Sequence, residues 1–367
     1  MPDDSSPTPA PHKRRPRYRG KNPRHFEEKY KEHDPQRYGE TVAKVMASGK
    51  TPAGTHRPIM VAEILAVLSP KPGEVAVDCT LGYGGHAQEI LPRLQPGGKL
   101  LGLDADPIEL PKAEARLRAL GFGSEIFTAQ RSNFAGLPKV LARAGVNGAD
   151  IILADLGVSS MQIDDPARGF SVKHEGPLDM RTNPQRGQPA SVFLQKIDSD
   201  ELAALLLENA DEPNAGTLAS ALAGKLFITT SSLATAIRAA LPRLKQGDSD
   251  LSVRRVFQAL RIAVNDEFSA LDTFLRNMPM SLNPGGRVAV LTFHSGEDRR
   301  VKKSFEAGLR HGSYSEIAPE VIRPTAAERN FNPRSASAKL RWARRQPSYP
   351  QIPWLNLSYS ISRMARG

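Results

Sequence analysis

The sequence predicts an α/β protein, a doubly wound Rossmann-like sheet of parallel strands with one helical insertion. Two observations support this fold class. Short apolar segments typical of buried strands alternate with helical patterns over residues 74–155, and the alternation resumes after residue 252. Between these stretches, helical patterns follow one another without an intervening strand. That interruption predicts an insertion rather than a second sheet.

The individual elements follow from local periodicity and punctuation. Strands are expected at 74–79, 99–104, 125–129, 149–155 and 287–293. Helices are expected at 59–68, 86–94, 108–120, 134–144, 198–208, 216–225, 231–241 and 252–277. Pro70 and Pro72-Gly73 punctuate the chain before the first strand, and Asn283-Pro284-Gly285-Gly286 predicts a turn before the last. Strands this apolar predict a sheet covered by helices on both faces.

The chain is expected to divide into three parts. Residues 1–50 are rich in Pro, Lys, Arg and Tyr, lack periodicity, and are expected to form a disordered basic arm. Residues 51–162 and 249–367 form the sheet domain, and residues 163–248 form the helical insertion. The insertion leaves the carboxyl edge of the fourth strand, where open α/β sheets bind ligands, so it is placed to hold a substrate. The alternative is a surface elaboration without a role.

Composition excludes several classes of protein. The chain has 367 residues, 40% of them hydrophobic, without an apolar run near the roughly 20 residues of a membrane span. The N-terminus lacks the apolar region of a secretion signal, so a cytoplasmic location is expected. Cys79 is the one cysteine and the histidines are dispersed, which argues against a disulfide or a metal centre.

Positive charge points to a polyanionic partner. The net charge is +11, and residues 12–24 alone hold seven Lys or Arg. A second basic run spans residues 334–345, including Lys339, Arg341, Arg344 and Arg345. Two such runs predict nucleic-acid contact, and the alternative for each is a solvated tail or face.

The passage from Asp78 to His86, DCTLGYGGH, predicts a ligand site. It joins a strand to a helix through a glycine-rich turn, which lets a ligand lie against bare backbone. A carboxylate before the glycines repels a pyrophosphate and favours a cationic or amine-bearing ligand such as S-adenosylmethionine. Asp104 ends the next strand about twenty residues later, where an acid can bind both ribose hydroxyls of an adenosine. NAD is the rival ligand, although this turn lacks the last glycine of G-x-G-x-x-G.

Other polar residues end strands at the same edge. Asp155 ends the fourth strand, where it would orient the cofactor or accept a proton, or else serve as a helix cap or loop anchor. His294 follows the last strand and is either a site residue or structural. His86 opens a helix, where the dipole disfavours its protonated form. Residues 163–183 are dense in acids, Arg and Gly, and long structured loops of this composition are usually functional.

Several motifs resemble those of the bacterial cytosine-N4 methyltransferases of small-subunit ribosomal RNA, the ribosomal RNA small subunit methyltransferase H family of MraW type. The similarity covers residues 55–345. The matching stretches are 56–58, 78–86, 104–107, 155–160 with Gln162, 164–171, 176–181, 257–262 with Asn265, 293–295 with 297–299, and 332–335. The chain departs from the family pattern at residues 209–222 and at Gly296.

The resemblance implies a class I S-adenosylmethionine-dependent methyltransferase domain, with residues 163–248 as its substrate-recognition insertion. It implies cofactor contacts from Gly84, Gly85, His86, Asp104, Phe134, Asp155 and Gln162. The implied partner is small-subunit ribosomal RNA, free or in the assembled subunit, and the implied acceptor is a cytosine of its decoding region. A homodimer is compatible with the sequence, and no metal ion or membrane is expected.

The expected reaction is in-line methyl transfer to the exocyclic N4 amine of the cytosine. That nitrogen is a poor nucleophile because its lone pair is delocalised into the ring, so a hydrogen-bond acceptor must localise it and take its proton. Asp155, Asp179 and His294 are the candidate catalytic residues. The alternatives are a methyltransferase acting on another RNA, DNA or protein, an NAD oxidoreductase, and a non-catalytic RNA-binding or assembly factor.

Overall fold

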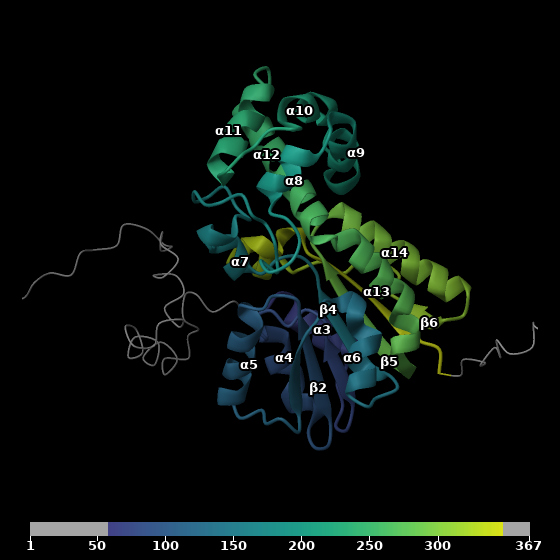
Figure 1. Ribbon diagram of the computed structural model, residues 1–367. Helices are drawn as coiled ribbons and strands as arrows, with labels where there is room; N and C mark the ends of the chain where they lie inside the picture. Colours follow the sequence, from purple (N-terminus) through teal and green to yellow (C-terminus); the bar gives the residue numbers. More distant parts are fainter. Residues whose placement is uncertain (1–57, 348–367) are drawn as a thin grey trace, which may run out of the picture. The chain divides into compact units, whose positions relative to one another are not determined.

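A mixed sheet forms the centre of the computed structural model, which describes residues 58–347 (Figure 1). Its seven strands lie in the order β3-β2-β1-β4-β5-β7-β6, with β1 to β5 parallel and β7 antiparallel to both neighbours. The strands are β1 (Val75–Asp78), β2 (Lys99–Asp104), β3 (Phe127–Arg131), β4 (Ala149–Asp155), β5 (Leu282–Thr292), β6 (Tyr314–Ile317) and β7 (Lys339–Arg345). Strand order reverses between β1 and β4, which places the ligand crevice outside their carboxyl ends.

The central strands are buried on both faces. In β4, Ile152 and Ala154 face one hydrophobic core while Ile151 and Leu153 face another, and all four are 0% exposed. Alternating side chains point to opposite faces of a strand, so a continuous apolar run requires cover on both. The observed sheet confirms the predicted α/β fold class.

Helices cover the two faces. The core that contains Ile152 is completed by α6 (Leu137–Arg143), α13 (Glu267–Ser281) and α14 (Ser295–Arg310). The core that contains Ile151 is completed by α3 (Val61–Leu68), α4 (Gly85–Ile90) with the 3-10 turn η2 (Leu91–Leu94), and α5 (Glu109–Ala119).

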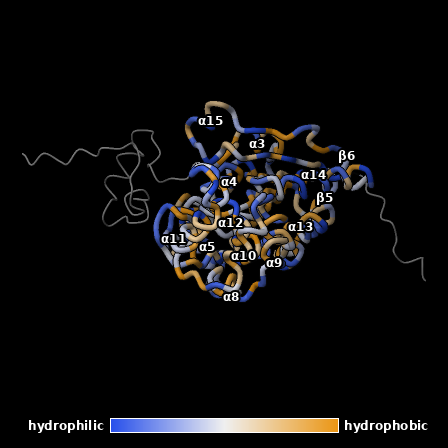
Figure 2. Tube along the Cα trace, turned by 90° about the horizontal axis from the view of Figure 1, so that it is seen from above, coloured by the Kyte–Doolittle hydropathy of each residue, from blue (hydrophilic) through white to orange (hydrophobic). Residues whose placement is uncertain are grey.

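The helices after β4 have a hydrophobic core of their own. These are α8 (Ala190–Lys196), α9 (Ser199–Ala210), α10 (Ala215–Leu222), α11 (Thr230–Ala240) and α12 (Gln246–Asn265). Leu202, Leu218, Leu233 and Leu260 are among the residues buried there at 0% exposure. Figure 2 shows hydrophobic positions recurring between hydrophilic ones along these helices, as expected of amphipathic helices packed side by side.

The structure corrects several predicted elements. The single helix expected at 252–277 is two helices, because Asp266 adopts a left-handed conformation with φ 52 and ends α12. The turn expected at 283–286 lies inside β5, where the register with β4 shifts between Ala149 and Ile151. The elements α7 (Ser160–Asp164), α8, α14, α15 (Ala326–Phe331), β6 and β7 were missed.

The second basic run is a strand rather than a free basic surface. Lys339 Nζ lies 3.1 Å from Asp298 Oδ2, and Arg341 Nε lies 2.7 Å from Asp298 Oδ1. Arg334 pairs with Asp164 at 2.6 Å. These three charges are therefore compensated within the protein, whereas Arg344 is 47% exposed, and nucleic-acid contact by residues 334–345 stays a prediction.

Two further features concern residues 58–347 alone. No helix among them has both the length and the apolar character needed to cross a bilayer. They also contain no cluster of three or more His, Cys, Asp or Glu side chains suited to a metal ion. The expected arm at 1–50, including the basic run at 12–24, lies outside the described residues, as do His56 and Arg57.

Candidate active site

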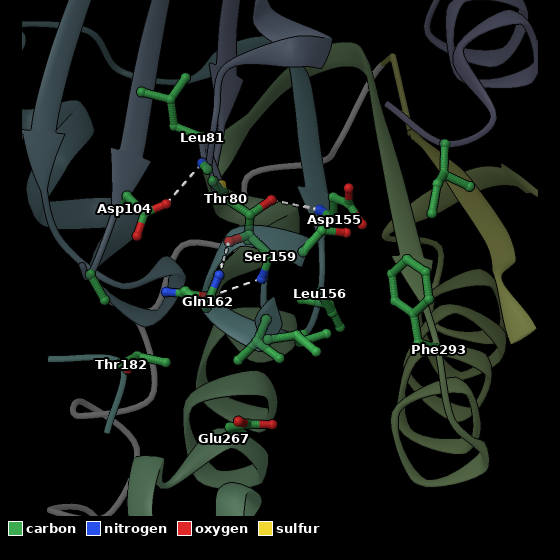
Figure 3. Close-up of a pocket in the computed structure, with 18 of the residues that line it drawn as sticks. Thr80, Leu81, Asp104, Asp155, Leu156, Ser159, Gln162, Thr182, Glu267 and Phe293 are labelled. Carbon is green, nitrogen blue, oxygen red and sulfur yellow. Dashed lines mark hydrogen bonds between the residues drawn. The ribbon is translucent and has the colours of Figure 1, made fainter. Parts of the chain in front are cut away.

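A cavity of about 590 Å³ opens at the carboxyl ends of β1, β2, β4 and β5 (Figure 3). Of the residues predicted to bind a cofactor, Gly85, His86, Asp104, Phe134, Asp155 and Gln162 line it. Gly84 does not. The structure thus brings six residues, from segments up to 77 positions apart, to one cavity.

The glycine turn between β1 and α4 brings bare backbone to the cavity wall. Gly84 has φ 77, and a Cβ built on it would lie 3.0 Å from Leu117 Cδ1. A Cβ on Gly85 would lie 3.1 Å from Pro58 Cδ. A larger residue would therefore be strained by the positive φ at Gly84, and at both positions its Cβ would crowd the neighbouring side chain. Gly84 supports the turn, its N–H donating to Leu81 O at 2.6 Å.

Asp104 is held rigidly at the end of β2. Its Oδ2 accepts the N–H of Gly82 at 2.8 Å, and its Oδ1 accepts the N–H of Asp106 at 2.8 Å. Burial raises the pKa of Asp104 to about 6, although these two hydrogen bonds oppose the shift. Each carboxylate oxygen has a second lone pair, so the side chain can still accept hydrogen bonds from two ligand hydroxyls.

Asp78 takes a different position from the one expected. Its side chain is 2% exposed, does not line the cavity, and accepts the N–H of Thr80 at 3.1 Å. Burial raises the pKa of Asp78 to about 7. The side chain of Asp78 holds the turn through its hydrogen bond to Thr80 and does not face the cavity. The expectation that it faces a cationic ligand was therefore wrong.

Asp155 provides the carboxyl group that reaches the cavity. Its backbone N–H donates to Thr80 Oγ1 at 2.6 Å, and burial raises its pKa to about 8, with Asp78 and Glu297 adding to the shift. His86 Nδ1 lies 3.7 Å from Asp155 Oδ2, and His86 Nε2 lies 3.0 Å from Ile59 O. Burial lowers the pKa of His86, so the ring is neutral and donates from Nε2 to that carbonyl.

Gln162 lines the cavity while it fastens the loop after β4. Its Oε1 accepts the N–H of Ser159 at 2.9 Å, and Ser159 Oγ accepts the N–H of Gln162 at 3.2 Å, forming a capping box for α7. Its Nε2 donates to Asp106 Oδ2 at 2.7 Å. Phe134 packs at 5.4 Å, ring centroid to centroid, from Phe274, which gives the cavity an aromatic wall beside β3.

Two of the predicted catalytic residues lie outside the cavity wall. Asp179 forms a two-point ion pair with Arg181, at 2.7 Å to Nε and 2.8 Å to Nη2. That pairing outweighs partial burial and lowers the pKa of Asp179. His294 caps α14, its Nδ1 accepting the N–H of Glu297. Of the three candidates, Asp155 alone reaches the cavity wall.

Several lining residues were not singled out from the sequence. They include Thr80, Asn133, Thr182, Arg261, Asn265, Glu267, Phe268, Phe293 and Glu297. Arg261, Asn265, Phe293 and Glu297 fall in segments that match the family pattern, which was the available signal. No sequence signal pointed to Glu267, because it follows the unexpected break between α12 and α13.

The loop from Met180 to Thr182 is tied to the rest of the site from two sides. Arg168 Nη2 donates to Arg181 O at 3.2 Å and to Thr182 O at 2.9 Å, while Arg168 Nη1 pairs with the buried Asp106 at 2.8 Å. Asn265 Oδ1 accepts the N–H of Thr182 at 2.7 Å. Met180, with φ 64 and 0% exposure, is held in a conformation that few non-glycine residues adopt.

The buried acids of the cavity show which ligand it suits. Asp104 and Asp155 have raised pKa values because burial is not offset by an adjacent cation, so a ligand that carries positive charge would stabilise their ionised forms. S-adenosylmethionine carries all three matching groups: ribose hydroxyls for Asp104, a planar adenine ring for Phe134 and a positive charge for Asp155. The residues therefore fit this methyl donor.

Comparison with known proteins agrees with this geometry. Residues 53–346 match the model of the MraW methylase family. Ribosomal RNA small subunit methyltransferase H 2 of Alkaliphilus metalliredigens is 51% identical over 339 residues, which cover 90% of this chain and 97% of that protein. Ribosomal RNA small subunit methyltransferase H 1 of Lachnoclostridium phytofermentans is 49% identical over 341 residues, covering 90% and 93%. The chain belongs to the MraW methylase family and is an S-adenosylmethionine-dependent methyltransferase.

Proposed function

We propose that this enzyme methylates the exocyclic N4 of a cytosine in the decoding region of small-subunit ribosomal RNA. One observation carries the proposal: a single cavity is lined both by the strand-end acids Asp104 and Asp155 and by Phe293, Glu267 and Arg261. Figure 3 shows Glu267 across the cavity from Asp104, and we call the Glu267 side the acceptor half. The donor half, on the Asp104 side, suits a methyl donor, and the acceptor half suits a planar, polar acceptor. The names of the relatives, which refer to small-subunit ribosomal RNA, support this acceptor.

The donor half assigns a role to each predicted contact. Asp104 would bind the ribose hydroxyls, Phe134 would pack on the adenine, and Gly85 and His86 would leave room for the amino-acid tail. When bound, S-adenosylmethionine supplies an electrophilic methyl group on a sulfonium. Gly84 and Gln162 would act indirectly, by holding the turn and the loop in place.

Asp155 would orient the amine and receive its proton. A carboxylate that accepts a hydrogen bond from N4–H raises electron density on the nitrogen, and the same group can take the proton as the N–C bond forms. In the free enzyme the pKa of Asp155 is about 8, and a cationic donor beside it would favour the ionised form that accepts this hydrogen bond. Cytosine would have to leave its base stack to reach Asp155 at the cavity wall.

The remaining assignments are also proposals. Residues 51–162 and 249–367 would form the methyltransferase domain, and 163–248 the insertion that recognises the RNA. The substrate would be either free ribosomal RNA or the assembled small subunit in the cytoplasm. Sedimentation of the purified enzyme, alone and with assembled subunits, would establish which substrate binds and whether a homodimer forms.

Mass-spectrometric mapping of modified nucleosides in small-subunit ribosomal RNA tests the proposal. Deleting the gene should remove N4-methylcytidine from one decoding-region position, and the wild-type gene should restore it. Asp155→Asn should restore little. Unchanged N4-methylcytidine after deletion would refute the proposed acceptor.

A different acceptor is the second candidate, favoured by the departure from the family pattern at residues 209–222. In this segment Asp211 accepts the hydroxyl of Ser295 at 2.8 Å and pairs with Arg299 at 3.2 Å. The segment therefore contributes to the surface between the end of α9 and α14. Tritium transfer from labelled S-adenosylmethionine to transfer RNA or DNA, but not to ribosomal RNA, would support this candidate.

A further inference from the structure

The acceptor half of the cavity contains a partly buried ion pair that the methyl-donor site does not use. Arg261 Nη2 of α12 donates to Glu267 Oε2 of α13 at 2.8 Å, and the two side chains are 16% and 19% exposed. Both residues line the cavity. Figure 3 shows Glu267 on the far side of the cavity from Thr80 and Asp104.

The pair retains hydrogen-bonding capacity. Within residues 58–347, Arg261 Nε is buried and has no hydrogen-bond partner, and the salt bridge to Glu267 is the one hydrogen bond made by its side chain. Glu267 Oε1 accepts no hydrogen bond in the same part of the chain. A buried donor without a partner costs free energy, which a ligand with a matching acceptor would recover.

The surroundings suit a flat aromatic ring. Phe268 and Phe293 line the same cavity as the ion pair, as does Asn265. Flipped bases are commonly read by hydrogen bonds to the Watson–Crick edge while apolar side chains contact the ring faces. The cytosine edge presents an amine donor beside two acceptors, N3 and O2. A carboxylate beside a guanidinium presents the complementary pattern of hydrogen-bonding groups: the carboxylate accepts from the amine, and the guanidinium donates to N3 and O2.

We propose that Arg261 and Glu267 are the base-recognition pair of the acceptor site, with Glu267 accepting one N4 hydrogen and Arg261 donating to N3 and O2. This inference rests on the proposed function, because it names the groups that read its cytosine. The amine carries two in-plane hydrogens, and Asp155 and Glu267 would accept one each. Together they would fix the plane of the base, so that the lone pair of N4 faces the methyl donor.

A change in the RNA alone tests the guanidinium contact. In 2-thiocytidine the acceptor O2 is replaced by sulfur, a poor acceptor, while the amine remains. With wild-type enzyme, kcat/KM for RNA carrying 2-thiocytidine at the target position should fall about tenfold or more. The penalty should shrink in Arg261→Lys if Arg261 makes the contact. Equal turnover of the two RNAs by wild-type enzyme would overturn the proposal without depending on any variant.

A change in the protein tests the carboxylate contact. Glu267→Gln should raise KM for RNA and lower kcat/KM by about 10- to 100-fold, with the dissociation constant of S-adenosylmethionine unchanged. Glu74→Gln is the matched control, because Glu74 pairs with Arg287 at 2.7 Å with 16% and 11% side-chain exposure, before β1 and outside the cavity lining. Glu74→Gln should leave KM for RNA, kcat/KM and the dissociation constant of S-adenosylmethionine unchanged.

The outcomes separate this inference from the proposed function. If Glu267→Gln has wild-type RNA kinetics, or loses only thermal stability to the same extent as Glu74→Gln, the pair is structural and the inference is overturned. If wild-type enzyme methylates no cytosine, the proposed function fails and this inference with it. If wild-type enzyme methylates cytosine and Glu267→Gln has the same RNA kinetics, the proposed function stands and only the base-recognition pair is overturned.

Discussion

At the residue scale, Asp155 dominates the electrostatics of the site. Its pKa of about 8 lies far above the unfolded value near 4, so the folded apo-protein binds more protons than the unfolded chain between those pH values. The free energy of unfolding should therefore fall as pH rises from about 4 to 8 on account of this group. Asp78 and Asp104, with pKa values of about 7 and 6, act in the same direction.

The affinity for the methyl donor should change with pH in the opposite sense. A cationic ligand binds more tightly to ionised Asp155, so the dissociation constant of S-adenosylmethionine should decrease as pH rises from 6 to about 8, by up to roughly tenfold per unit for one released proton. Isothermal titration calorimetry at several pH values measures this slope.

Asp155→Asn should flatten that slope and is its control. The donor's own amino group titrates identically with both proteins, so the difference between the slopes isolates Asp155. If wild type and Asp155→Asn have the same dependence of the dissociation constant on pH, the ionisation of Asp155 is not coupled to ligand binding.

Sequence reasoning at this scale found the acids at the strand ends but not the direction of every side chain. Asp104 and Asp155 line the cavity as predicted, since strand order and length fix where a strand ends. His294 also ends a strand, yet its ring turns back to cap α14. Asp179 is captured by Arg181 two residues later. Such local pairings compete with a site role and depend on rotamers that spacing does not reveal.

At the element scale, the buried ion pair between Arg168 and Asp106 links the segment after β2 to the loop from Met180 to Thr182. Arg168→Ala would leave Asp106, at 0% exposure, without its cation and would free the carbonyl of Thr182. Breaking a buried pair on one side typically costs about 3–5 kcal/mol. Urea denaturation should show a loss of that size.

The exposed pair between Arg238 and Asp250 provides the matched control. Its side chains are 42% and 36% exposed, so Asp250→Asn should change the free energy of unfolding by less than about 1 kcal/mol. Equal effects of the two substitutions would contradict the tethering role of Arg168.

The elements that sequence reasoning missed share a physical cause. The strand β7 is rich in charged residues, and Lys339 and Arg341 pair with Asp298 of α14, so from the sequence alone it resembles a basic surface segment. The break at Asp266 was hidden because the residues on both sides continue a helical pattern. The break is stabilised by a residue remote in sequence, because Asn265 Nδ2 donates to Met180 O at 2.8 Å. Both depend on contacts remote in sequence.

At the scale of the whole molecule, the basic N-terminal arm is expected to contact RNA phosphates. Deleting residues 1–50 should flatten the dependence of RNA affinity on salt concentration, because each lost phosphate contact lowers the logarithmic slope by about one. Filter binding at several salt concentrations measures the slope.

A charge-neutralised arm separates charge from length. Replacing the seven Lys and Arg of residues 12–24 by Gln should flatten the slope in the same direction as the deletion. An unaltered slope in both proteins would mean that the arm is not part of the RNA interface.

The account depends on the methyl donor occupying the cavity at the carboxyl ends of β1, β2 and β4. Calorimetric titration with S-adenosylmethionine tests this most directly, with wild-type enzyme beside Asp104→Ala and the control Glu74→Gln. Wild type and Glu74→Gln should bind with the same affinity, and Asp104→Ala should bind at least about tenfold more weakly, as expected for lost hydrogen bonds to a charged group. Unchanged affinity in Asp104→Ala would contradict the account.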